Sequence, residues 1–379
     1  MKIAINCMFC TPHSGGIKEY IVNLTRNLAL IDKENEYIYY VLEDQIDYAR
    51  KQLPAVGRIK KIPFKSNLFE KIKRSLLSQR FWTKEEETEE FDIFHSPFFY
   101  APKFKKAKLI VTVHDLRLYR FPQTYPLLRL VFLRHSVKET INRANAIIAV
   151  SNFTKNEIVE YCNIPESRII VIHEAIDRAA FSEKSLEKYT LPAEFKVLIE
   201  SRFIFSLGHI EPRKNYIRLI EAFELVKKRK EFEDLKLVIA GRLNWKSREV
   251  RKLIGRTEDV IYLKFVPREL LLWLYKHTSL FVFPSYYEGF GFPPLEAASM
   301  GTVSAVSQVS SIPEVCGDSV FYFDPYNVEK MSEVIMACLD DVKIITNKKM
   351  ELEKQLDLFS WRKNAQLTMD LYKKVLSLS

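Results

Sequence analysis

Short apolar runs rich in β-branched residues alternate with segments of helical periodicity along this chain, and this alternation restricts the fold more than any other feature. The first run covers residues 2–8, and apolar residues at helical spacing follow between Ile17 and Leu30. More runs occur at 37–42, 93–95, 109–114 and 146–150. Strands that alternate with helices form a parallel sheet covered by helices on both faces. The first half of the chain is therefore expected to be a doubly wound α/β domain.

The alternation stops over residues 177–196, which are polar and irregular, and then starts again. A strand is predicted at 203–207, a loop at 208–214 and a helix at 215–228. Further strands are predicted at 235–240, 260–265, 280–283, 302–306 and 320–323. We therefore predict two tandem Rossmann-like domains of class α/β. They are expected at 1–178 and 201–360, with a linker at 179–200 and an amphipathic helix at 361–379.

Composition excludes several classes of protein. Among the 379 residues, no apolar run reaches the roughly 18–20 residues that a membrane-spanning helix needs. Residues 1–6 are too short and too soon polar for a signal peptide. The five cysteines are odd in number and scattered, so they give no disulfide framework. We therefore expect a cytoplasmic protein rather than a membrane channel, a secreted cystine scaffold or a fibrous repeat protein.

The chain is basic, with 58 Lys and Arg against 48 Asp and Glu and a formal charge of +10. Such an excess predicts an anionic partner: nucleic acid, a lipid surface or a phosphorylated substrate. Residues 51–80 concentrate basic charge beside an apolar stripe at 68–77. Two interpretations stay open for this segment. It is either an amphipathic helix on an anionic membrane, or a helix packed on the first sheet with its charges in solvent.

Glycine is scarce, with 10 residues where average usage gives roughly 27. Eight of them stand at predicted strand ends or helix starts. In open α/β sheets, ligands bind beyond the carboxyl ends of the strands. Two such sheets facing each other across a deep cleft would bring both sets of loops together. This arrangement predicts a nucleotide-type ligand held between the domains.

The densest stretch is residues 284–297, with the sequence PSYYEGFGFPPLEA, between a predicted strand and a helix. Proline in the first helical turn leaves free N–H groups that suit a phosphate. Gly289 and Gly291 allow the backbone to come close to a ligand. Pro294 takes the place of the third glycine of a dinucleotide fingerprint, so NAD is a poor fit.

Glu288 and Glu296, seven residues apart in this stretch, resemble the E-x7-E motif of the family 4 glycosyltransferases, which are retaining enzymes of the GT-B fold. Further matches lie in the same order along the chain. Residues 15–17 resemble the first glycine-rich loop of the family, and residues 208–215 (GHIEPRKN) resemble its phosphate-binding loop. The stretch from 311 to 325 resembles the segment that closes its second domain. The family's C-terminal helix crosses back to the first domain, and the helix that begins at Trp361 matches it.

The resemblance implies roles for individual residues. Arg213 and Lys214 would bind the donor diphosphate, Glu296 the ribose, and Glu288 and His114 would lie near the donor sugar as catalytic groups. The implied donor site also includes Gly15, Gly16, Gly208, Val266, Gly289, Phe290, Gly291 and Phe292. Simpler alternatives stay open: solvated charges for the two cations, helix-start acids for the two glutamates and a structural histidine for His114.

Three residues at first-domain loops, His13, His95 and Asp115, are candidates for contact with the acceptor. For the two histidines a structural role is the alternative, and Asp115 would equally well cap the next segment. The sequence has no Asp-x-Asp, and Cys7-x-x-Cys10 lacks a second pair, so we expect no metal and no cofactor besides the substrate. Arg213, Lys214 and helix ends would neutralise the leaving group instead.

The loop at 211–215 together with the segment at 311–315 resembles the subset of the family that assembles bacterial surface polysaccharides. This likeness implies transfer of a hexose, with GDP-mannose the favoured donor, to a saccharide or lipid-linked saccharide at the inner face of the cell membrane. UDP-glucose or UDP-N-acetylhexosamine transfer and sugar-phosphate synthesis are alternatives. A nucleic-acid-binding protein or a non-catalytic membrane scaffold is the alternative of another class, although neither explains the two-glutamate loop.

Two positions depart from the family pattern. Lys264 stands where glycine is common, and residues 173–177 read HEAID where the family commonly has an Asn-Gly pair. Both departures bear on the base or the acceptor rather than on the diphosphate.

Overall fold

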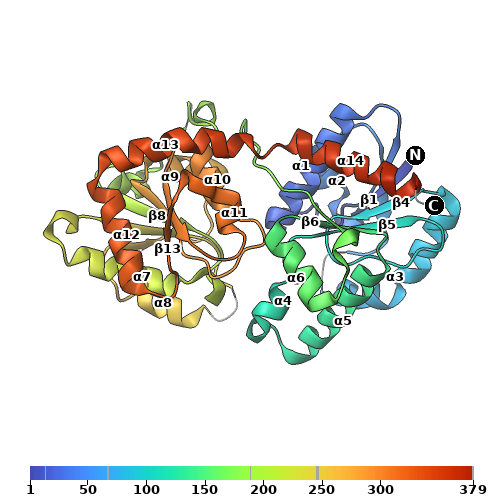
Figure 1. Cartoon of the computed structure of the whole chain (residues 1–379), viewed down its shortest axis with the longest axis horizontal. Coiled ribbons are helices and arrows are strands. Elements are labelled where there is room, and N and C mark those ends of the chain that lie inside the picture. Colours follow the sequence, from blue (N-terminus) through green and yellow to red (C-terminus); the bar gives the residue numbers. More distant parts are fainter. Residues whose placement is uncertain (13, 66–67, 188, 245–246, 378–379) are drawn as a thin grey trace. The chain divides into compact units, whose positions relative to one another are not determined.

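The structure is a computed structural model that describes residues 1–12, 14–65, 68–187, 189–244 and 247–377. Its contacts divide the chain into two compact units (Figure 1). Unit 1 comprises Met1–Ala175 with Ser360–Ser379, and unit 2 comprises Ile176–Phe359. Each unit is built on its own sheet.

The sheet of unit 1 has seven parallel strands in the described residues, in the order β3-β2-β1-β4-β5-β6-β7. Its strands are β1 (Lys2–Asn6), β2 (Glu36–Leu42), β3 (Arg58–Ile62), β4 (Ile93–Ser96), β5 (Lys108–Val113), β6 (Ala146–Ala149) and β7 (Ile169–Val171). The central strands are buried on both faces, as parallel strands between two helical layers must be. The order reverses beside β1, so the loops after β1 and β4 meet at a topological switch point.

Helices cover both faces of this sheet (Figure 1). They are α1 (Gly15–Ile31), α2 (Ile46–Gln52), α3 (Leu68–Glu89), α4 (Arg117–Arg120), α5 (Leu127–Arg143), α6 (Asn152–Cys162) and α14 (Trp361–Ser377), with short 3₁₀ turns η1 (Glu43–Gln45), η2 (Pro122–Thr124) and η3 (Glu166–Arg168). Helix α14 packs along α1 and buries Trp361, Ala365, Met369 and Tyr372 at helical spacing. The predicted return of the last helix to the first domain is therefore confirmed.

The sheet of unit 2 has six parallel strands in the described residues, in the order β10-β9-β8-β11-β12-β13. They are β8 (Phe203–Leu207), β9 (Lys236–Ala240), β10 (Val260–Tyr262), β11 (Leu280–Phe283), β12 (Ser304–Ser307) and β13 (Phe321–Phe323). Successive side chains point to opposite faces, so Phe203 and Phe205 join one core cluster while Ile204 joins the other. The switch point lies beside β8, and the loops after β8 and β11 share that edge.

The helices of unit 2 lie on both faces of its sheet (Figure 1). They are α7 (Tyr216–Lys227), α8 (Arg248–Ile254), α9 (Arg268–His277), α10 (Phe292–Ser299), α11 (Ile312–Cys316), α12 (Val328–Asp340) and α13 (Val342–Asp357), with 3₁₀ turns η4 (Glu183–Leu186), η5 (Ala193–Leu198), η6 (Pro212–Lys214), η7 (Lys230–Phe232) and η8 (Gly317–Ser319). Within the described residues, every helix of either unit is too short or too polar to cross a membrane.

Residues 179–200, predicted as a linker, are instead part of unit 2. Leu198 is buried in a core cluster of this unit, and Phe181, Leu186, Tyr189, Leu191 and Phe195 pack against that cluster. A long helical or strand periodicity is absent because η4 and η5 are 3₁₀ segments of four and six residues. Their widely spaced apolar side chains still cover one face of the sheet.

Candidate active site

The loop that follows β8 begins where two backbones come into close contact. Gly208 has φ +154° and Gly241, at the end of β9, has φ +150°. A Cβ atom on Gly241 would lie 1.9 Å from the carbonyl oxygen of Gly208. Only glycine fits there, and this close approach fixes the path of the chain toward η6.

Arg213 and Lys214 lie in η6, and Asn215 then takes a left-handed conformation, with φ 58°, before α7 begins. The Asn215 side chain donates to the carbonyl oxygen of Pro325 at 2.9 Å, which ties this turn to the segment after β13. Both cations are largely buried, so the solvated-charge alternative does not describe them. Lys214 also stands 4.9 Å above the ring of Phe283, the last residue of β11.

Glu288 forms ion pairs with both Arg213 and Lys214. Lys214 Nζ lies 2.5 Å from Glu288 Oε1, and an Arg213 guanidinium nitrogen lies 2.9 Å from Glu288 Oε2. Arg213 also pairs with Glu211, with Nε and Oε1 2.5 Å apart. The predicted diphosphate ligands, Arg213 and Lys214, therefore form one buried cluster with the predicted sugar-facing carboxylate, Glu288. Glu211 is the second acid of this cluster.

The cluster is held in its charged form. Burial acts to raise the pKa of Glu288, but Arg213 and Lys214 outweigh it and bring that pKa down to about 2. Burial is also the main cause that lowers the pKa of Lys214, with the Arg213 charge acting in the same direction and Glu288 opposing both. A pair of preorganised cations beside an ionised carboxylate suits an anionic leaving group.

The loop around Glu288 is anchored by backbone contacts. Arg213 donates to the Tyr287 carbonyl oxygen at 2.9 Å, and the Tyr286 N–H donates to the Arg213 carbonyl oxygen at 2.8 Å. Ser311 Oγ donates to the carbonyl oxygens of Glu288 and Phe290, at 2.9 and 2.8 Å. The segment from 311 onward, identified by resemblance alone, therefore supports the two-glutamate loop directly.

Gly291, with φ +108°, leads from this loop into α10, which begins at Phe292. Glu296 lies on α10 and accepts a hydrogen bond of 2.7 Å from the Tyr275 hydroxyl. Phe290 is buried and its ring meets that of Phe292 edge to face, 5.5 Å apart. Glu296 therefore stands apart from the Glu288 cluster, with a partner of its own.

Val266 is buried beyond β10, and Lys264 before it has φ 54°. The carbonyl oxygen of Lys264 accepts a bond of 2.6 Å from the Gly241 N–H. The left-handed conformation at this lysine explains why glycine is common at the matching place in the family.

In unit 1, His114 follows β5 and has both ring nitrogens engaged. Nδ1 lies 2.8 Å from Glu174 Oε1, and Nε2 lies 2.8 Å from the carbonyl oxygen of Pro97. Both partners offer acceptor oxygens, so the geometry favours the doubly protonated, positively charged imidazole. Burial alone would lower the pKa of His114, but the charge and hydrogen bond of Glu174 raise it above its usual range.

One of the acceptor candidates, His95, has a structural role instead. His95 lies in β4, fully buried, with Nδ1 2.6 Å from the Tyr372 hydroxyl and Nε2 2.9 Å from Thr112 Oγ1. Burial lowers the pKa of His95 to about 3, with the nearby charge of His114 acting in the same direction, so this ring is neutral. Asp115 accepts from the Arg117 N–H at 3.2 Å, as the capping alternative predicts. The third candidate, His13, lies outside the described residues.

The glycine-rich loop of unit 1 ends at the start of α1, whose first two residues are Gly15 and Gly16. Gly15 has φ +54°, and a Cβ atom there would meet no other atom within 4 Å. Its backbone conformation, rather than crowding, therefore favours glycine.

Three basic residues of the segment 51–80 are paired within unit 1. Arg58 and Lys60 of β3 both pair with Glu89, Lys60 also pairs with Glu85, and Lys61 pairs with Glu43. The acidic run at the end of α3 therefore neutralises Arg58 and Lys60, and Glu43 of η1 neutralises Lys61. The apolar stripe at 68–77 has side chains outside the described part of the structure, so the membrane prediction for it stays a prediction.

Comparison with known proteins places this geometry in a family. Residues 14–180 match the family described as Glycosyltransferase Family 4, and residues 192–355 match Glycosyl transferases group 1. An Escherichia coli relative named O-antigen chain mannosyltransferase B is 31% identical over 287 residues, which cover 74% of each chain. The chain belongs to the family 4 glycosyltransferases. The matched residues lie in both units.

A second relative of this family 4 glycosyltransferase is named serotype-specific mannosyltransferase WbdA, also from Escherichia coli. It is 32% identical over 252 residues, which cover 62% of this chain and 30% of that relative. Solved structures share the fold. A Thermosynechococcus elongatus sucrose-phosphate synthase has TM-score 0.78 at 16% identity, covering 100% of both chains. A Rickettsia africae glycosyltransferase has TM-score 0.72 at 17% identity, covering 100% of this chain and 99% of that one. The prediction of a GT-B fold with two Rossmann-like domains is confirmed.

Sequence reasoning missed three residues of the glycosyltransferase that position its predicted site. Glu211 and Ser311 stand inside motifs already quoted, but nothing in their spacing showed that they contact Arg213 and the Glu288 loop. Glu174 was noted only as a departure from the family pattern. The departure from the family pattern could have indicated a role for Glu174, since a buried acid in place of an amide requires a charged or hydrogen-bonding partner.

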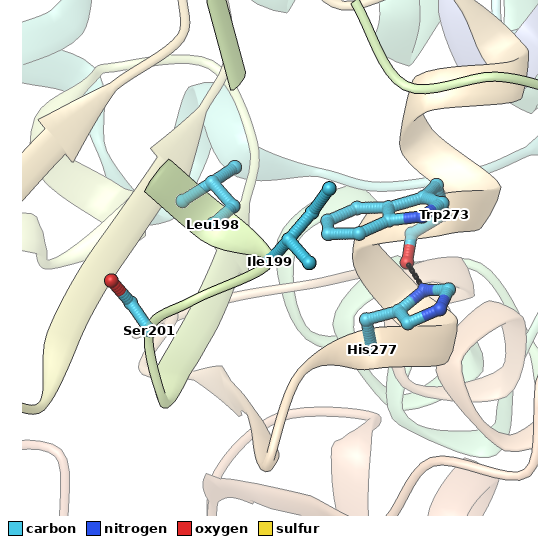
Figure 2. A pocket seen from close by; sticks show the side chains of 5 residues that line it. All are labelled: Leu198, Ile199, Ser201, Trp273 and His277. Atoms are coloured by element: carbon cyan, nitrogen blue, oxygen red, sulfur yellow. Dashed lines mark hydrogen bonds between the residues drawn. The ribbon is translucent and has the colours of Figure 1, made fainter. Parts of the chain in front are cut away.

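A cavity of about 260 Å³ in unit 2 lies away from this cluster. Figure 2 shows its lining residues, Leu198, Ile199, Ser201, Trp273 and His277. Ser201 precedes β8 and His277 precedes β11, so the cavity lies at the amino ends of the strands. The candidate active site of the enzyme lies at their carboxyl ends.

Proposed function

We propose that this glycosyltransferase moves mannose from GDP-mannose, with retention of anomeric configuration, to a saccharide or lipid-linked saccharide in surface-polysaccharide synthesis. The proposed location is cytoplasmic, at the inner face of the cell membrane. The observation that carries the proposal is the buried cluster of Arg213, Lys214 and Glu288 at the carboxyl end of the second sheet. The names of the Escherichia coli relatives support mannose as the sugar.

Unit 2 would hold the donor. A diphosphate brings two or more negative charges, which Arg213 would bind with its planar fork and Lys214 as a point charge. The diphosphate then competes with Glu288 for both cations. A carboxylate released in this way becomes available to the sugar hydroxyls or to positive charge at the anomeric carbon. Glu296 would hold the ribose, oriented by its hydrogen bond from Tyr275.

The two cations would also assist departure of the nucleoside diphosphate. Negative charge grows on the leaving oxygen as the bond to the anomeric carbon breaks, and fixed cations in a buried site stabilise it without reorganising. In a front-face reaction the leaving diphosphate accepts the proton of the incoming hydroxyl. We therefore expect no metal to be required.

Unit 1 would hold the acceptor, with the loop at Gly15 and Gly16 and the charged His114 at its sugar-facing edge. Glu174 keeps His114 doubly protonated, so this ring would donate hydrogen bonds or supply positive charge rather than remove a proton. General-base catalysis by His114 is excluded in this proposal as long as the pair with Glu174 is intact.

Radiolabelled transfer tests the proposal. Purified enzyme is incubated with membrane lipid extract and with GDP-mannose, UDP-glucose or UDP-N-acetylglucosamine, with and without EDTA. Label is expected in the lipid fraction with GDP-mannose in both conditions, and nuclear magnetic resonance of the product is expected to show the donor's anomeric configuration. Lys214→Ala should lower the rate by about a hundredfold or more.

The matched control is Lys330→Ala, which removes an exposed lysine of unit 2 that pairs with Glu333. This variant should transfer at the wild-type rate. Transfer from a UDP-sugar alone would reassign the donor, and loss of transfer in EDTA would contradict metal-independent chemistry.

A further inference from the structure

Helix α5 of unit 1 carries an apolar surface that no part of the described structure covers. Leu127, Leu128, Val131 and Phe132 are 73%, 87%, 60% and 52% exposed. Leu130, Val137 and Ile141 of the same helix are buried in the core. We call the four exposed residues the α5 patch.

The α5 patch is concentrated on one side of the helix. Residues spaced one, four and five positions apart, as these are, project from adjoining parts of an α-helix surface. Among the described residues, other exposed large hydrophobic side chains occur singly or in pairs along the chain. Four exposed apolar side chains within six consecutive positions are therefore a specific feature of α5. This helix lies at the lower edge of unit 1 in Figure 1. Exposed apolar surface of this kind marks an interaction site.

Basic side chains accompany the patch. Helix α5 contains Arg129, Arg134, Lys138 and Arg143 but one acidic residue, Glu139. Glu139 pairs with Lys103 at 2.9 Å, so its charge is neutralised within the protein. Arg129 and Lys138 are exposed on the same helix, Arg129 within the span of the patch and Lys138 beyond it. The exposed face of α5 therefore combines apolar side chains with positive charge.

This combination decides between two occupants. A second copy of the chain would bring like charges together at a small patch, whereas stable protein interfaces bury about 800 Å² on each partner. An anionic lipid surface complements both properties, since acyl chains accept the apolar side chains and headgroups attract the basic ones.

We propose that unit 1 docks on anionic membranes through the first half of α5, with the α5 patch inserted among lipids and Arg129 and Lys138 at the headgroups. This surface differs from the segment 51–80, where Arg58, Lys60 and Lys61 of β3 pair with acids of unit 1. The inference goes beyond the proposed donor and does not depend on it. An enzyme attached in this way would meet lipid-linked acceptors in two dimensions rather than three.

Co-sedimentation with vesicles tests this docking surface. Wild-type protein is mixed with vesicles of phosphatidylcholine alone or of phosphatidylcholine with phosphatidylglycerol. Binding is expected to the second kind, and to weaken with added salt because the headgroup attraction is screened. The variant Leu128→Gln/Val131→Gln should lose about tenfold or more in partition, since two buried side chains are removed from the lipid phase. Arg129→Gln should bind more weakly and with a smaller dependence on salt.

The control is Leu30→Gln, which removes an equally exposed leucine (71%) from α1. It should bind vesicles as the wild type does. Nucleotide binding by unit 2 should be the same in every variant, which separates failure of this inference from failure of the proposed function. The proposal is overturned if the wild-type protein does not bind anionic vesicles, or if the double variant binds them as well as the wild type does. It is also overturned if the variant only converts a dimer into a monomer in sedimentation, which would assign the patch to a second copy.

Discussion

At the scale of single residues, the pair of His114 and Glu174 shows how burial and geometry together set a protonation state. Each ring nitrogen faces an acceptor at 2.8 Å, and the Tyr20 ring lies edge to face 4.9 Å away. Asp115 raises the pKa of His114 slightly further. His95 is near enough for the charge on His114 to lower its own pKa. The histidine with a carboxylate partner thus favours the charged form, whereas its buried neighbour, held by two hydroxyls, is neutral.

This pair predicts a stability that depends on pH with a definite sign. The folded pKa of His114 lies above the unfolded value of about 6.5, so the stabilisation is complete below pH 6.5 and is lost as pH rises through the folded value. Glu174→Gln should therefore be less stable than wild type by about 2 kcal/mol at pH 6, and the difference should shrink toward pH 9. Urea unfolding across this range measures it.

Glu157→Gln is the matched control, because Glu157 is a buried glutamate of the same unit paired with Arg120. Arginine keeps its charge throughout this range, so the loss of stability in that variant should not change with pH. A Glu174→Gln difference that is equally independent of pH would contradict a charged His114.

At the scale of elements, the strand ends of unit 2 depend on glycine at one contact. Gly241→Ala would put a Cβ 1.9 Å from the Gly208 carbonyl oxygen, on a backbone with φ +150°. We expect a loss of about 2 kcal/mol or more, which corresponds to a Tm lower by about 4–8 °C, together with weaker nucleotide binding as the loop before η6 shifts.

Gly255→Ala provides the comparison for that substitution. Gly255 ends α8 with φ −75°, and a Cβ atom there would find its nearest neighbours 3.6 and 3.7 Å away. This alanine should leave the Tm unchanged or slightly raised. Equal effects of the two substitutions, measured by thermal unfolding, would show that the Gly208–Gly241 contact does not restrict the loop.

The elements that sequence predicts best are those in which local pattern and tertiary environment agree. Parallel strands such as β6 and β11 are continuous apolar runs because both of their faces are buried, and helix α14 keeps helical spacing because one face packs on α1. Residues 179–200 escaped prediction because 3₁₀ turns have no long period to detect.

The candidate site was predictable in its residue types but not in its contacts. The charges and glycines of the 208–215 and 284–297 loops indicated an anionic ligand. Whether Glu288 pairs with Arg213 and Lys214 depends on how the ends of β8 and β11 adjoin, and only the fold decides that. His95 was misplaced for a related reason: it ends the predicted run 93–95, and only the fold shows that β4 continues to Ser96 and buries the ring.

At the scale of the whole molecule, the chemistry is distributed over the two units. Unit 2 contains the buried cationic cluster, and unit 1 contains the charged histidine and the α5 patch. In the proposed function, unit 2 binds the soluble donor and unit 1 meets the lipid-linked acceptor. Each unit can therefore be tested by a different ligand, a nucleotide for one and a vesicle for the other.

The most direct test of the central claim, that Arg213 and Lys214 bind a donor diphosphate, is nucleotide binding by thermal shift. GDP, UDP, ADP and GDP-mannose are compared on wild type, Lys214→Ala and the exposed-lysine control Lys330→Ala, in EDTA. A ligand that binds only the folded state raises the Tm with its affinity. The account predicts that GDP and GDP-mannose raise the Tm of wild type and control, and that Lys214→Ala, compared with its own ligand-free Tm, responds little. No response of wild type to any nucleotide, or an undiminished response of Lys214→Ala, would contradict it.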